Sequence, residues 1–133
     1  NLSPLFVALV SFCFSMTVGV VWEIYEYSVD MAFKSDMQKD EYIETIRTVK
    51  LDPYQNNSVV TIDGIDYTIV YNDKNEEIAR FDGYLDIGLF DTMKDLFVNF
   101  IGAIVFSIIG YLYIKNREKY KFVQSFIPTK NKI

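Results

Sequence analysis

The sequence predicts a mainly α-helical membrane protein, an antiparallel transmembrane helical hairpin with a small α+β insert that contains a β-hairpin. Two uncharged apolar runs predict the helices, Leu5 to Val21 and Leu96 to Ile114. At about 1.5 Å of rise per residue, such runs can cross most of a hydrocarbon layer of about 30 Å. The stretch between them is polar and acidic, and part of it alternates apolar with polar residues, which is typical of strands.

These observations divide the chain into four expected segments. They are a first transmembrane helix with an acidic C-terminal end (1–33), an acidic insert with a short helix and a small antiparallel sheet (34–90), a second transmembrane helix (91–114) and a basic tail (115–133).

The first apolar run has the features of a membrane helix that packs closely on another helix. Pro4 suits a first helical turn. Ser11, Ser15 and Gly19 recur at every fourth position, a spacing that lets two helix backbones approach in lipid. A signal peptide is the competing interpretation, but no basic region precedes the run and no small-residue cleavage site follows it. A soluble protein with two very apolar core helices remains an alternative.

The insert carries local signals for both helix and strand. Residues 34–50 are polar with a weak helical period, which predicts the short helix. The Asp63-Gly64 pair is a strong hairpin signal and predicts strands over 58–62 and 65–72, with a further short strand over 77–81. Because an isolated hairpin is only marginally stable, we expect this sheet to rest on the helices, on another chain or on additional strands.

The net charge of −5 is unevenly distributed. Twelve acidic and six basic residues lie between Lys34 and Asp86, whereas 115–133 holds six basic residues and one acidic residue. The positive-inside rule therefore predicts a cytoplasmic tail and an insert outside the cell. Membrane lipids are the expected partners. Nucleic acid is not, because the basic tail is short and lacks a recognition module.

The residue types exclude several classes of site within this chain. It has no histidine and a single cysteine, Cys13. A zinc site with the usual nitrogen and sulfur ligands, a histidine-based catalytic triad and an internal disulfide are therefore excluded.

Carboxylates gather where the two predicted helices face the insert. The first helix ends with Glu23, Glu26 and Asp30, and the second begins with Asp91 and Asp95. An antiparallel hairpin brings both sets to one membrane face. Clustered negative charge at partial membrane depth requires protonation, a positive partner or a bound cation. Because Mg²⁺, Mn²⁺ and Ca²⁺ take oxygen ligands, these five carboxylates predict a divalent cation site.

Two other hypotheses explain the same residues. In the first, Asp91 caps its helix, Glu26 and Asp30 are solvated interface residues, and Lys94 is their ion-pair partner. In the second, a proton or ion pathway runs through Glu23, Asp95 and Asn99.

Three short motifs resemble a known kind of protein. They are WEIYEYSVD, DMQ and DTMKDLFVNFIGA. Together they resemble a family of small bacterial membrane proteins of unassigned function, similar in style to the VanZ-like proteins of the cell envelope, over about half the chain. The resemblance implies a polytopic membrane protein of the bacterial cell membrane with acidic residues near one face. The matching positions are Glu23, Glu26, Asp30, Gln38, Asp91, Asp95, Asn99 and Gly102.

The sequence leaves open whether the protein is an enzyme. One hypothesis is a cation that holds an envelope lipid or glycan headgroup in an enzyme or transporter, with metal-assisted phosphoryl chemistry and a metal-activated water as the nucleophile. The alternative is a non-catalytic membrane subunit or scaffold whose external insert docks a partner. Small residues at Gly102, Ala103, Ser107 and Gly110 are consistent with a homo-oligomer or a partner membrane protein.

Overall fold

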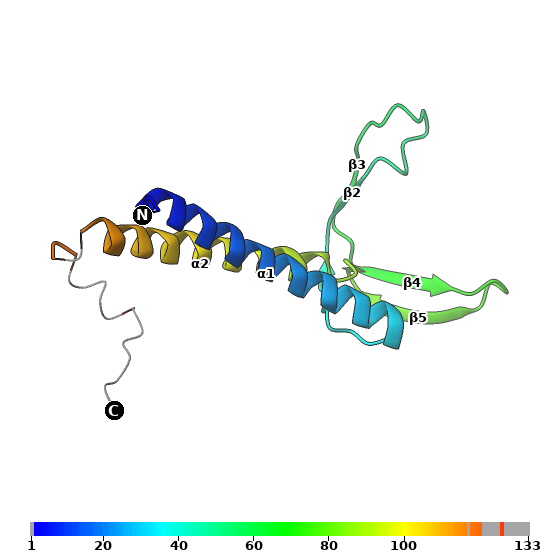
Figure 1. Cartoon of the computed structure of the whole chain (residues 1–133). Coiled ribbons are helices and arrows are strands. Elements are labelled where there is room, and N and C mark those ends of the chain that lie inside the picture. Colours follow the sequence, from blue (N-terminus) through cyan, green and yellow to red (C-terminus); the bar gives the residue numbers. More distant parts are fainter. Residues whose placement is uncertain (1, 117, 121–125, 127–133) are drawn as a thin grey trace. The chain divides into compact units, whose positions relative to one another are not determined.

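The computed structural model describes residues 2–116, 118–120 and 126 of the 133 (Figure 1). Two compact units divide the chain. One holds both long helices and comprises Asn1–Ser35 and Thr92–Ile133, and the other is the insert, Asp36–Asp91. Most of the predicted basic tail lies outside the described residues.

Helix α1 spans Pro4–Phe33. The start of α1 is capped, because the hydroxyl of Ser3 accepts a hydrogen bond from the Phe6 N–H at 3.2 Å. Pro4 occupies the first turn, as expected. The helix ends at Lys34, which has left-handed backbone angles. The first predicted helix is therefore confirmed, and it continues without a break through its acidic end.

Helix α2 spans Leu89–Lys115 and runs antiparallel to α1 (Figure 1). The carboxylate of Asp86 stabilises the start of α2 by accepting a hydrogen bond from the Phe90 N–H at 2.6 Å. The two helices meet at Phe12 and Phe100, whose rings pack edge to face with centroids 5.9 Å apart. The predicted helical hairpin is thus present.

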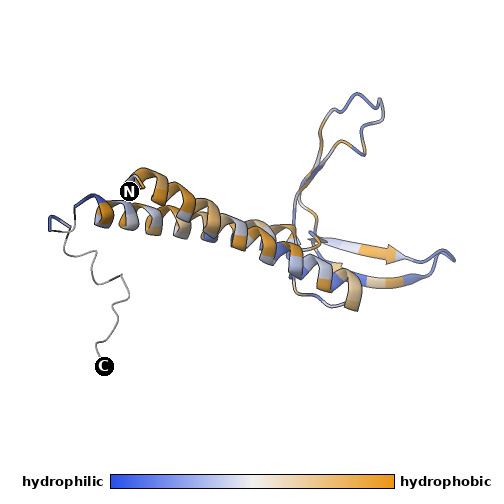
Figure 2. Cartoon of the chain, viewed as in Figure 1, coloured by the Kyte–Doolittle hydropathy of each residue, from blue (hydrophilic) through white to orange (hydrophobic). Residues whose placement is uncertain are grey.

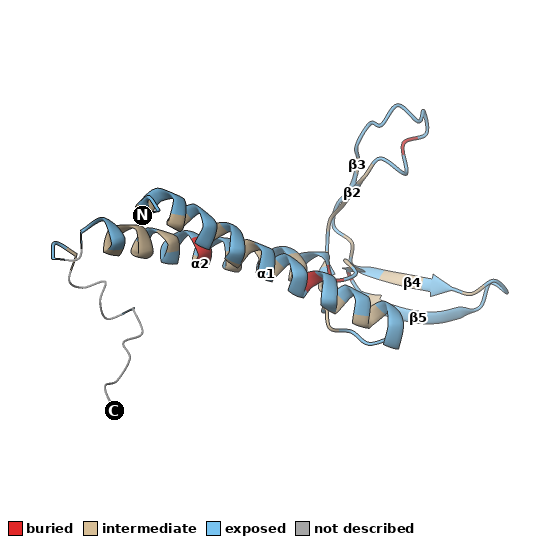
Figure 3. Ribbon diagram, viewed as in Figure 1, coloured by how far each residue is buried: buried red, intermediate tan, exposed pale blue. Residues whose placement is uncertain are grey.

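The helices expose their apolar side chains. Both are long and apolar enough to cross a membrane. Figure 2 shows hydrophobic residues along both helices, and Figure 3 shows that most of their surface is exposed. Ala103, at 3% exposure, is the one fully buried hydrophobic residue among those described. A soluble protein would bury such faces, so this pattern fits helices surrounded by lipid rather than soluble core helices.

The insert forms three separate antiparallel pairs of strands. Strand β1 (Tyr42–Ile43) pairs with β6 (Tyr84–Leu85), β2 (Ile46–Thr48) pairs with β3 (Val60–Ile62), and β4 (Tyr67–Tyr71) pairs with β5 (Glu77–Asp82).

The predicted strands are present, but the predicted hairpin is wrong. Strands β3 and β4 lie inside the expected ranges and β5 ends one residue beyond its range, yet β3 and β4 do not pair across Asp63-Gly64. The residue after this turn, Ile65, instead donates its N–H to the carbonyl of Glu44 at 2.9 Å. The hairpin turn forms at Asn72, whose side-chain oxygen accepts hydrogen bonds from the N–H groups of Lys74 and Glu76.

The short helix expected in the insert is also wrong. Residues 34–50, all of which the structure describes, hold strands β1 and β2 instead. A weak helical period gives little stabilisation to so short a segment, so pairing with β6 and β3 determines its structure.

Candidate functional site

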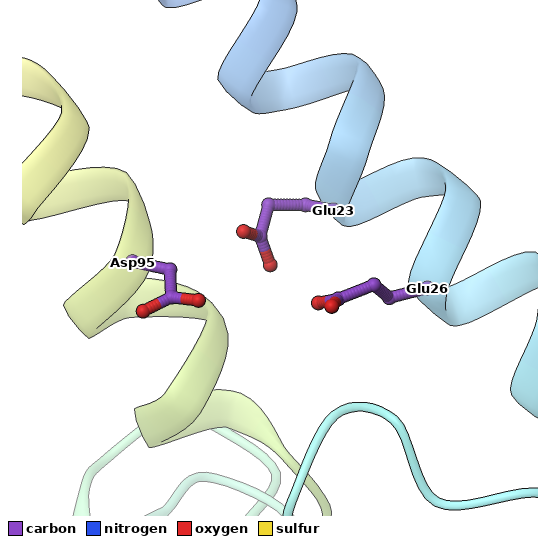
Figure 4. A group of neighbouring side chains, drawn as sticks. All are labelled: Glu23, Glu26 and Asp95. Atoms are coloured by element: carbon purple, nitrogen blue, oxygen red, sulfur yellow. The ribbon is translucent and has the colours of Figure 1, made fainter.

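Three carboxylates meet between α1 and α2. Glu23 and Glu26 on α1 and Asp95 on α2 each place one oxygen so that these oxygens lie within 4.8 Å of one another. Figure 4 shows the three side chains directed toward the space between the helices. We call these three residues the carboxylate cluster.

Helical spacing explains why these residues converge. Glu23 and Glu26 are three positions apart, so they lie on one face of α1. Asp95 and Asn99 are four positions apart on α2 and share a face in the same way. Asn99 reaches α1, where its side-chain nitrogen lies 3.4 Å from the carbonyl oxygen of Ser15.

The three carboxylates differ in their surroundings. Glu23 is 8% exposed and its Oε2 atom is buried. Glu26 is half-buried and accepts a hydrogen bond from the indole N–H of Trp22 at 2.9 Å. Asp95 is exposed. The cluster therefore extends from a buried oxygen to one that solvent or a ligand can reach.

A hollow adjoins the cluster. Its volume is about 380 Å³, and its lining includes the polar residues Glu23, Asp95 and Asn99 and the apolar residues Val18 and Trp22. This volume is within the range of about 300–1,000 Å³ that is usual for small-molecule sites. The lining joins carboxylate and amide oxygens to apolar surface, which suits a hard cation or a polar group carried by a lipid.

The remaining predicted site residues make other contacts. Asp30 accepts a hydrogen bond from the Ser35 hydroxyl at 2.8 Å. Asp91 accepts one from the Lys39 N–H at 3.1 Å. Neither belongs to the group of acidic side chains within ligand distance that the described residues form. Lys94 is exposed on α2.

Gln38 has a structural contact within the insert. Its carbonyl oxygen and Cβ lie against Gly88, where an added Cβ would be 2.7 Å from the oxygen and 2.8 Å from the carbon. Gly88 also has a positive φ of 72°. The DMQ segment therefore packs on the loop that leads into α2.

Asp86 organises this loop, although the sequence did not single it out. Its carboxylate accepts hydrogen bonds from the N–H groups of Glu41, at 2.8 Å, and Phe90. Burial alone would raise the pKa of Asp86, but these bonds and one from Gly88 lower it below the ordinary value of 3.8. An aspartate three residues before an apolar helix is the signal that could have identified it.

Asp52 has a similar role in the loop between β2 and β3. It is 7% exposed and accepts hydrogen bonds from the N–H groups of Ser58, Tyr54 and Asn56. These bonds lower the pKa of Asp52, against the effect of burial. The loop between β2 and β3 is thus ordered around a single carboxylate.

Comparison with known proteins gives the family. No curated protein matches the chain, and no solved structure matches it. One family, described as "Predicted membrane protein (DUF2238)", matches residues 1–116. This match covers both helices and the whole insert. The chain therefore belongs to the DUF2238 family of predicted membrane proteins.

Proposed function

We propose that this protein binds a divalent cation, Mg²⁺, Mn²⁺ or Ca²⁺, at the carboxylate cluster. The observation that carries the proposal is the convergence of oxygens from Glu23, Glu26 and Asp95, within 4.8 Å of one another, from two different helices. Three clustered negative charges beside apolar helix surface are costly unless something offsets them. Oxygen ligands favour hard cations over zinc or copper.

The cation in turn holds a polar headgroup of an envelope lipid or glycan in the adjoining hollow. Membrane-spanning helices would give such a headgroup access to the hollow from the lipid side. A bound cation can polarise a phosphoryl oxygen, which leaves both a transporter and an enzyme consistent with the site.

The orientation that we propose follows from charge. The basic residues after α2 favour the cytoplasm, which puts the insert outside the cell. The test uses a Cys13→Ser background with Lys74→Cys in the insert, since Cys13 is the single native cysteine and Lys74 is exposed. A membrane-impermeant thiol reagent added to intact bacterial cells should label this variant. Labelling only after lysis would reverse the orientation.

Calorimetry on the detergent-purified chain tests the cation site. We expect one cation per chain, with binding weakened about tenfold or more in Asp95→Asn, because outer-shell partners of metals alone are worth about 10–100-fold. Asp30→Asn is the matched control, since Asp30 hydrogen-bonds Ser35 and lies outside the cluster. Equal binding by the wild type and by Asp95→Asn, with both folded, would reject the site.

A scaffold role is the second candidate function, and the insert favours it. Its three strand pairs leave strand edges open, and it exposes large apolar side chains such as Tyr54, at 80%, and Ile87, at 81%. Open edges and apolar patches are features by which proteins dock partners. A scaffold would retain its partner in Asp95→Asn but would lose it in a variant whose insert is altered. Co-purification of the partner with each of these two variants therefore distinguishes a scaffold from a protein that acts through the cation site.

A further inference from the structure

A second hollow lies between the helices at the opposite end from the carboxylate cluster. It is a groove of about 290 Å³. Leu5, Leu9 and Phe12 of α1 and Ile104, Ile108 and Tyr111 of α2 form its walls. The groove lies between the N-terminal part of α1 and the C-terminal part of α2, so it is separate from the proposed cation site.

The shape and chemistry of the groove suit a hydrocarbon chain. Its lining also includes the small residues Ala8 and Ser107, which are half-buried, whereas Leu5, Leu9 and Ile108 are exposed beside them. Small side chains between projecting ones leave a channel along the helix pair. None of the described residues that line it is charged. An apolar occupant therefore fits along the groove, because no lining side chain carries a charge that could offset a buried one.

One end of the groove carries a positive charge. Tyr111 lines the groove, and its hydroxyl accepts a hydrogen bond from the ammonium group of Lys115 at 3.1 Å. The ammonium also lies 5.2 Å from the centre of the Tyr111 ring. Lys115 is the first charged residue after the apolar run that ends at Ile114, the position at which a helix reaches lipid headgroups.

This arrangement leaves donors for an anionic group. A tyrosine hydroxyl that accepts one hydrogen bond still has its own proton to donate, and a lysine ammonium has three donors. A phosphate at the groove end can therefore receive hydrogen bonds from both Tyr111 and Lys115. Charge-assisted bonds of this kind are stronger than neutral ones.

We propose that the groove binds one acyl chain of an anionic phospholipid, whose phosphate pairs with Lys115 and Tyr111. The charge at the groove end selects a lipid of net negative charge over a zwitterionic one, as basic residues next to membrane helices do. This site depends on the membrane location of the helices and not on a bound cation.

Native mass spectrometry of the full chain tests the proposal. The detergent-purified protein is incubated with equal amounts of phosphatidylglycerol and phosphatidylcholine that carry the same acyl chains. We expect the wild type to retain one phosphatidylglycerol in preference to phosphatidylcholine. Lys115→Gln should lower that preference about fivefold, the factor that corresponds to one basic residue near an anionic membrane surface.

Matched variants distinguish lipid binding in this groove from a general attraction of anionic lipid to basic residues. Lys119→Gln removes the same charge from a lysine that stacks on Tyr120 and does not line the groove, so its preference should equal that of the wild type. Ser107→Leu fills the groove and should lower retention of both lipids, whereas the same change at exposed Ser11 should not. Circular dichroism confirms that each variant keeps its helices.

Several results would overturn the proposal. Equal retention of the two lipids by the wild type would mean annular lipid only. An equal loss of preference in Lys115→Gln and Lys119→Gln would mean that all the basic residues after the second helix attract the anionic lipid, and not Lys115 in particular. Retention of a second protein chain without lipid, lost in Ser107→Leu, would mean that another helix fills the groove.

Discussion

Gly19 of α1 lies directly against the carboxamide of Asn99 of α2, and a Cβ built at Gly19 would overlap that group. Small residues allow this close approach in membrane helices, where packing and interhelical hydrogen bonds replace the hydrophobic effect. Glu23 and Asp95 each lie four positions from this pair on their own helices. The contact between Gly19 and Asn99 therefore sets the helix spacing at which the carboxylate cluster forms.

Gly19→Ala should weaken the helix pair. The added methyl group forces Asn99 to rotate away from the Ser15 carbonyl, so we expect a loss of about 1 kcal/mol in the free energy of helix association, as for other interhelical polar contacts. Reversible unfolding in mixed micelles measures it.

Gly102→Ala is the control for this change. Nothing lies within 4 Å of a Cβ at Gly102, so alanine should be neutral or stabilising by up to about 1 kcal/mol through helix propensity. If the two variants behave alike, Gly19 does not set the helix spacing.

Gly88→Ala should destabilise the insert more than Gly64→Ala. Both glycines have positive φ, 72° and 67°, so alanine costs about 1–2 kcal/mol at either position. Only at Gly88 does the new Cβ also collide with the backbone of Gln38, whereas at Gly64 the space is open. Limited proteolysis of the insert in the two variants checks the order, and a Gly64→Ala insert that is cleaved as fast would contradict the contact.

Substitution of Asp86 should separate helix capping from pH dependence. Asp86→Ala removes the acceptor for the N–H groups of Phe90 and Glu41 and should cost about 1 kcal/mol, a typical loss for a cap. Asp86→Asn keeps one acceptor and should cost less. Hydrogen exchange of the Phe90 amide measures both changes at neutral pH.

The pH dependence follows from the lowered pKa of Asp86. A carboxyl whose pKa is lower in the folded state stabilises the fold above its unfolded value, here 3.8, and this contribution is lost as the pH falls through the folded pKa. Protection of the Phe90 amide in the wild type should therefore fall below about pH 4. In Asp86→Asn it should not fall through this step, and an identical fall would assign the pH dependence to other carboxyls.

The sequence predicted the helices well because each rests on a long, uniform signal. It predicted the strand positions but not their partners. The Asp63-Gly64 signal is local, and it does not show that β3 pairs back with β2 and that β4 pairs onward with β5. Among the small residues that the sequence pointed out on α2, Ala103 is buried, whereas Gly102 and Gly110 have open space at Cβ.

The candidate site was predicted in part for a similar reason. Helical spacing is enough to put Glu23, Glu26 and Asp95 on facing sides of two helices. Asp30 lies near the end of α1 and Asp91 near the start of α2, where their hydrogen bonds to Ser35 and to the Lys39 N–H depend on how the chain leaves or enters each helix. A periodic pattern contains no information about these loop contacts.

Trp22 should report cation binding directly. It is the single tryptophan of the chain, and its indole N–H donates to Oε1 of Glu26. A cation that binds the Glu26 carboxylate changes this hydrogen bond. The tryptophan fluorescence emission should therefore shift on addition of Mg²⁺ or Ca²⁺, and the shift should saturate at one cation per chain.

Two variants test whether this fluorescence change reports a cation at the carboxylate cluster. Glu26→Gln should change the emission before any cation is added, because it alters the indole's acceptor. Asp95→Asn should leave the resting emission unchanged, since Asp95 does not bond Trp22, but should move the cation response to about tenfold higher concentration or beyond. A response of equal midpoint in Asp95→Asn would show that the cation binds elsewhere and that the three carboxylates do not act together.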